Sequence, residues 1–76
     1  MHISEELAIL RRVYRMSSRE KALQAERVLR LGAQDASRAT ELKLLFAIAQ
    51  RVKADLRAYD AALERAKIIR RTKARF

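Results

Sequence analysis

Residues 42–66 read LKLLFAIAQRVKADLRAYDAALERA, and this stretch decides the fold. Its apolar positions recur in alternating steps of three and four residues, at Leu42, Leu45, Ala49, Val52, Leu56, Tyr59, Leu63 and Ala66. Heptad spacing of this kind is typical of a helix that packs along a second helix at a shallow crossing angle. We therefore predict a long helix here, with this apolar stripe, Leu56 included, as its core face.

The composition of the whole chain favours helices as well. Its 76 residues include one Gly, no Pro and no Asn, the residues on which tight β-turns depend. Strong helix formers such as Ala, Leu, Arg and Glu dominate the remainder. The predicted fold class is all-α.

A single break interrupts the helical pattern. Gly32 follows a basic turn that ends in Arg30 and Leu31, which is typical of a glycine C-cap. Ser4 is placed to cap the start of helix one, and Asp35 or Ser37 can cap helix two. We predict one domain over 1–76, a long antiparallel helical hairpin made of helix one at about 4–31, a turn at 32–35, and helix two at about 36–74 with a basic extension over 67–76.

Helix one contains a stretch without apolar residues from Ser17 to Lys21. Ser17 followed by Glu20 fits a capping box, so a break near Ser17 would give three helices. Neither Gly nor Pro occurs there, and Ser costs little inside a helix. A continuous helix one is therefore the favoured interpretation, with three helices as the alternative.

Apolar residues off the stripe predict an interface. Leu44, Phe46 and Ile48 lie outside the heptad positions, and one partner helix cannot cover all sides of this stretch. A short chain without disulfides often needs a partner to be stable. Dimerisation into a four-helix bundle is the simplest way to cover these residues, and a different protein partner is the alternative.

Positive charge gathers at the C-terminal end. The net charge is +9, and the last ten residues contribute +5 because they contain no acid. We expect this end to bind an anion or a partner, through Lys67, Arg70, Arg71, Lys73 and Arg75. The alternative is a solvated helix end whose cations complement the helix dipole. Arg outnumbers Lys, which favours an acidic protein surface, and nucleic acid phosphate is the second candidate target.

Several classes of function are not expected. The chain has no Cys and one His, His2, so it cannot supply a catalytic triad or a zinc site by itself. We expect no enzyme activity, cofactor, metal or small-molecule substrate. The longest apolar run, Leu44 to Ala49, is far shorter than the roughly 20 residues of a membrane span. The acidic start is unlike a signal peptide, so we expect a cytoplasmic protein.

A dimerising hairpin of this size resembles, in architecture alone, the plasmid RNA-binding proteins of the Rop type and the small co-chaperones of type III secretion. No residue role is carried over from either. The sequence predicts a non-enzymatic helical protein–protein interaction or assembly module, such as an adaptor, a co-chaperone or a small subunit of a larger complex. The alternative is a sequence-nonspecific RNA- or DNA-binding hairpin dimer of the Rop type.

Overall fold

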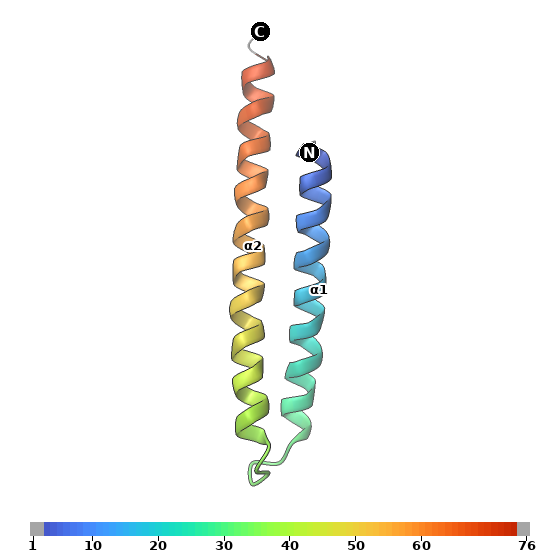
Figure 1. Ribbon diagram of the computed structural model, residues 1–76, viewed down its shortest axis with the longest axis vertical. Helices are drawn as coiled ribbons and strands as arrows, with labels where there is room; N and C mark the ends of the chain where they lie inside the picture. Colours follow the sequence, from blue (N-terminus) through green and yellow to red (C-terminus); the bar gives the residue numbers. More distant parts are fainter. Residues whose placement is uncertain (1–2, 75–76) are drawn as a thin grey trace.

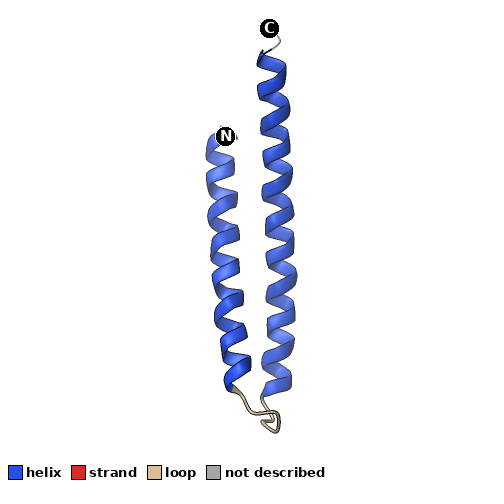
Figure 2. Cartoon of the chain, turned by 180° about the vertical axis from the view of Figure 1, so that it is seen from behind, coloured by secondary structure: helices blue, strands red, loops and turns tan. Residues whose placement is uncertain are grey.

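The chain folds as two antiparallel helices joined by one loop. The computed structural model describes residues 3–74, with side chains described through Thr72. Helix α1 spans Ile3–Arg30, helix α2 spans Arg38–Ala74, and the pair measures 65 × 16 × 14 Å (Figures 1 and 2). The predicted all-α hairpin is confirmed. Within this described part, neither helix has a segment long and apolar enough to cross a bilayer.

Helix α1 runs through Ser17 without a break. The Ser17 side chain is buried, and its Oγ donates a hydrogen bond to the Tyr14 carbonyl at 3.1 Å. A hydroxyl that is satisfied by the preceding turn of its own helix does not cap a new helix. Helix one is therefore continuous, and the three-helix alternative does not occur.

The loop is organised by Asp35 and Ser37. The Asp35 carboxylate accepts hydrogen bonds from the Ser37 backbone N–H at 2.9 Å and from the Ser37 hydroxyl at 2.7 Å. These bonds favour the charged form, so they hold the pKa of Asp35 below its usual value. The Ser37 carbonyl accepts from the Glu41 N–H at 3.0 Å, which begins α2. Both residues expected to start the second helix therefore take part.

Gly32 does not cap α1 in the expected way. A glycine C-cap uses a left-handed backbone, and no described residue has a positive φ. The end of α1 is closed instead by a bond from the Leu31 N–H to the Val28 carbonyl at 3.2 Å. In addition, the Arg38 guanidinium donates to the Leu31 carbonyl at 3.0 Å. The Arg38 side chain, at the start of α2, thus satisfies a carbonyl group just after the end of α1, which the predicted glycine cap does not do.

The inward row of α2, which we call the seam, differs from the predicted stripe. Its members are buried or half-buried: Glu41, Leu45, Ile48, Val52, Asp55, Tyr59, Ala62 and Ala66. The prediction was right at every second position, including Leu45 and Val52. At the other positions the preceding residue is the more buried one, although the predicted Ala49 and Leu63 are still half-buried. Leu56 is 38% exposed, whereas Ile48 is 5% and Ala62 is 3% exposed.

A polar contact between the helices accounts for this shift. Gln24 of α1 is buried, and its Nε2 donates to the Glu41 carbonyl at 2.9 Å and to Glu41 Oε2 at 2.6 Å. Because a buried amide needs partners, Glu41 must face α1. Residues one heptad apart share a face, so Ile48 and Asp55 face α1 as well. A stripe built from apolar residues alone could not include Glu41 or Asp55.

Candidate interaction surface

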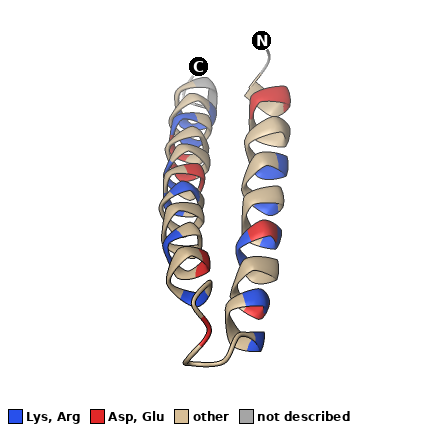
Figure 3. Ribbon diagram, turned by 60° about the horizontal axis from the view of Figure 1, so that its bottom comes forward, with Lys and Arg blue, Asp and Glu red and all other residues tan. Residues whose placement is uncertain are grey.

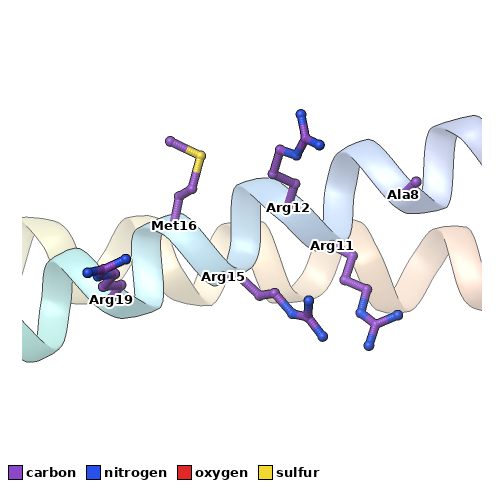
Figure 4. Close-up of a pocket in the computed structure, with 6 residues that line it drawn as sticks. All are labelled: Ala8, Arg11, Arg12, Arg15, Met16 and Arg19. Carbon is purple, nitrogen blue, oxygen red and sulfur yellow. The ribbon is translucent and has the colours of Figure 1, made fainter.

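Four arginines lie on the outer face of α1, and we call them the arginine cluster: Arg11, Arg12, Arg15 and Arg19. Their side chains are exposed and, together with Ala8 and Met16, line a shallow surface depression. Figure 4 shows Arg12 and Met16 leaving one side of the helix, and Arg11 and Arg15 leaving the other. Arg11, Arg15 and Arg19 follow one another at successive turns, over about 12 Å of helix.

No carboxylate neutralises the arginine cluster in the described part of the chain. Residues 7–19 contain no acid, and Figure 3 shows basic positions on α1 between its acidic first turn and its next acidic position. The two nearest glutamates, Glu6 and Glu20, are paired with arginines of α2 instead. Like charges four residues apart on a helix each cost about 0.2–0.5 kcal/mol. The cluster is thus a surface of +4 charge that destabilises the isolated helix slightly and that an anion would relieve.

The basic end predicted from the sequence lies on the last turns of α2, which runs past the N-terminal end of α1 (Figure 1). Lys67 is exposed, and its Nζ lies 3.4 Å from Glu64 Oε1. Arg70 and Arg71 are exposed. The side chain of Lys73 and the whole of Arg75 lie outside the described residues. Within the described residues, two basic stretches therefore exist, one on each helix.

The three residues predicted as an interface do not form one surface. Ile48 lies in the seam, so it is not available to a partner, because the seam is shifted by one residue from the predicted stripe. Leu44 and Phe46 are 47% and 64% exposed. They flank the seam residue Leu45 on opposite sides, so a partner that covers Leu44 does not cover Phe46.

Sequence reasoning missed the arginine cluster because it compared the charge of the last ten residues with the rest of the chain. The signal was present in the spacing, since Arg11, Arg12, Arg15 and Arg19 fall at i, i+1, i+4 and i+8 in an acid-free segment. This spacing places all four within an arc of about 100°, less than a third of the helix circumference.

The comparisons with known proteins give no further guide. The sequence matches no family model, no curated protein and no solved structure. Across residues 3–74, no three acidic or histidine side chains gather into a group that could hold a metal ion, and His2 lies outside this range. The described surface presents the guanidinium groups of the arginine cluster. These planar groups have several N–H donors and bind carboxylates or phosphates in a bidentate manner.

Proposed function

We propose that the protein is a non-enzymatic helical interaction module. Its exposed apolar faces build an assembly, and its arginine-rich surface engages an acidic surface on a partner protein. The arginine cluster on the outer face of α1 is the observation that carries this proposal. A cytoplasmic location is part of it, because a chain without Cys needs no oxidising compartment to fold.

Three features of the arginine cluster support an acidic protein as the target. All its members are Arg rather than Lys, and Arg is the residue enriched at protein interfaces and in bidentate carboxylate pairs. All four side chains are exposed in the packed hairpin, so binding requires no change in it. Its charge is uncompensated within the described part of the chain, so a carboxylate partner gains contacts without first breaking an internal ion pair.

Sequence-nonspecific binding to RNA or DNA is the second candidate. It is favoured by the overall charge of +9 and by the second basic stretch at Arg70 and Arg71. Phosphate binding needs cations along a backbone and no base-reading motif. The two candidates use the same side chains but predict different responses to salt and to competitors.

The test compares two fluorescent probes, an acidic poly-glutamate peptide and an RNA duplex of similar charge, by anisotropy across a salt series. The variant replaces Arg11, Arg12, Arg15 and Arg19 with Gln. Each exposed ion pair contributes about 0.2–1 kcal/mol, so we expect the peptide affinity to fall roughly tenfold or more. Pull-down from a native extract, with and without nuclease treatment, then shows whether captured protein depends on nucleic acid.

A charge-matched control removes the same +4 from other exposed sites, by replacing Lys21, Lys43, Lys53 and Arg57 with Gln. This control should bind the peptide nearly as well as the unchanged protein. Equal losses in both variants would mean that net charge alone acts and would contradict the proposal. Preferential RNA binding, with a salt slope near one unit per neutralised phosphate, would select the second candidate.

A further inference from the structure

Three bulky apolar side chains stand exposed on successive turns of α1, and we call them the ridge: Ile9, Val13 and Met16. They are 51%, 42% and 66% exposed. They face a different direction from the seam, because Leu10, Tyr14 and Ser17 are the residues of this stretch that turn inward. Contiguous apolar surface of this kind on a small protein marks an interaction site.

A row of small residues runs beside the ridge on α2, and we call it the alanine row: Ala54, Ala58 and Ala61. All three are exposed. Alternating steps of three and four residues place them on one face with Arg51 and Arg65. Those arginines pair with Glu20 and Glu6 of α1, and the Arg65 Nη2 to Glu6 Oε1 distance is 2.7 Å. The ridge and the alanine row therefore lie on the same side of the hairpin.

The two ion pairs also show that the ridge and the alanine row lie at the same level along the long axis of the hairpin. Glu6 and Glu20 are two heptads apart on α1, and Arg65 and Arg51 are two heptads apart on α2. The ridge lies between the glutamates and the alanine row lies between the arginines. One patch results, bulky along one helix and small along the other, with an ion pair at each end. Val13 and Met16 line a groove together with Arg51 and Asp55 of α2, so the ridge borders the arginine that precedes the alanine row.

We propose that a second copy of this chain covers the patch. The two hairpins are related by a two-fold axis parallel to their long axis, so that α1 of each copy lies over α2 of the other. The ridge of one copy then packs on the alanine row of its partner, twice by symmetry. This proposal names the partner for the assembly part of the proposed function. It uses none of the four arginines, although Met16 of the ridge also lines the depression beside them.

Size and charge favour this arrangement over its alternative. In this arrangement each bulky side chain meets an alanine. Glu6 and Glu20, which pair with Arg65 and Arg51 of their own chain, then lie near the same two arginines of the partner. A two-fold axis perpendicular to the helices would instead stack α1 on α1 and α2 on α2. The glutamates of the two α1 helices would then face one another and repel. The alanines of the two α2 helices would also face one another and would leave voids between the helices.

The thin interior of a single hairpin supports the need for a second copy. Among the described residues, the buried hydrophobic side chains are Val28, Ile48, Val52 and Ala62, and no large side chain is fully buried. A chain of 76 residues without disulfides gains little margin from such a core. Closing the patch would add the ridge residues of both copies to a shared core.

Association is tested by measuring the molar mass in solution with light scattering, across a range of protein concentrations. We expect a dimer for the unchanged chain. Met16→Glu buries a charge in the proposed contact, and we expect its dimer dissociation constant to rise at least about a hundredfold. The matched control is Leu29→Glu, because Leu29 is 80% exposed and lies outside the patch. A monomeric unchanged chain, or a dimer weakened equally by both variants, would overturn the proposal.

Orientation is tested by disulfide trapping, which is clean because the chain has no Cys. Val13→Cys and Ala58→Cys chains are prepared separately, mixed and oxidised under native conditions. We expect disulfides between the two kinds of chain, and little linkage of Val13→Cys chains to one another. Preferential linkage of Val13→Cys to itself would indicate α1 stacked on α1 and would refute the stated axis. The test does not require either substitution to weaken the dimer, so its result does not depend on a destabilised variant.

The arginine-to-glutamine variant of α1 separates the two proposals. It should remain a dimer while losing the acidic peptide. A dimer that binds no acidic peptide would refute the proposed target and leave this inference standing. A monomer that binds the peptide through the arginine cluster would do the opposite.

Discussion

The two halves of the hairpin are built differently. In the half next to the loop, α1 and α2 bury Ser17, Gln24, Val28, Ile48 and Val52. In the open half, Ala62 is the one described residue that is buried, and the other inward residues are half-buried. The exposed ridge lies in this open half too.

This contrast concerns the interior of the hairpin. The loop-side half has apolar residues inside and a satisfied polar contact between Gln24 and Glu41, although Leu29 and Phe46 stay exposed on its outside. The open half has a shallower interior, and it also carries exposed apolar side chains, those of the ridge. A partner that covers the exterior would add most to stability in this half, which agrees with the position of the proposed dimer contact.

The largest expected effect comes from Ile48→Ala in the loop-side half. Ile48 is 5% exposed, and removing a buried aliphatic side chain costs about 2–5 kcal/mol in the free energy of unfolding. The measurement is urea unfolding followed by circular dichroism at one fixed protein concentration. Leu29→Ala, at a site 80% exposed, should cost less than about 0.5 kcal/mol. A matching loss in Leu10→Ala, from the open half, would break the comparison.

A smaller effect is expected from the buried polar contact. Gln24→Leu leaves the half-buried Glu41 carboxylate without its amide donor, which should lower the free energy of unfolding by about 1–3 kcal/mol. Adding Glu41→Leu removes this carboxylate, which would otherwise keep only Arg27 at 4.0 Å, and should restore most of the loss. The same urea measurement on both single variants and the double variant gives the coupling. Additive losses would show that the two side chains act separately.

The smallest effect, and a gain, is expected at Gly32. Its φ is not positive, and no atom lies within 4 Å of the place where a β-carbon would stand. Gly32→Ala should therefore raise the free energy of unfolding by about 0.4–1 kcal/mol, since the unfolded chain loses freedom and the folded one is unstrained. Thermal unfolding detects this as a higher midpoint. A destabilised variant would mean that the loop, and not the Arg38 and Gln24 contacts, holds the loop-side half together.

The sequence was sufficient to predict the hairpin, because composition and heptad spacing both favour long helices and Gly32 marked the connection. It was insufficient for the rotation of α2. That rotation depends on Gln24 meeting Glu41 across the two helices, a contact between residues far apart in the chain. Ile48 was therefore predicted at an interface and lies in the seam, while Leu56 was predicted in the core and is partly exposed.

The candidate site was predictable only in part. The excess of positive charge at the C-terminal end is visible in any count of charged residues. The spacing of Arg11, Arg12, Arg15 and Arg19 in an acid-free segment is visible in the sequence. That the flanking Glu6 and Glu20 pair with Arg65 and Arg51, and so leave the cluster uncompensated, is visible only in the structure. Charge compensation between helices is a property of the packed pair, so the sequence of one helix cannot show it.

The extension of α2 beyond α1 has a consequence for how order is distributed along the molecule. Starting a helix is costly, whereas lengthening one that already exists costs little per residue. The last turns of α2 can therefore stay helical without a neighbour, as a propagation from the packed part. Their helicity declines gradually toward the C-terminus as temperature rises, ahead of the cooperative melting of the hairpin. We therefore expect the positions of Arg70 and Arg71 to become less fixed as temperature rises. The four arginines of the cluster should keep their positions until the hairpin unfolds.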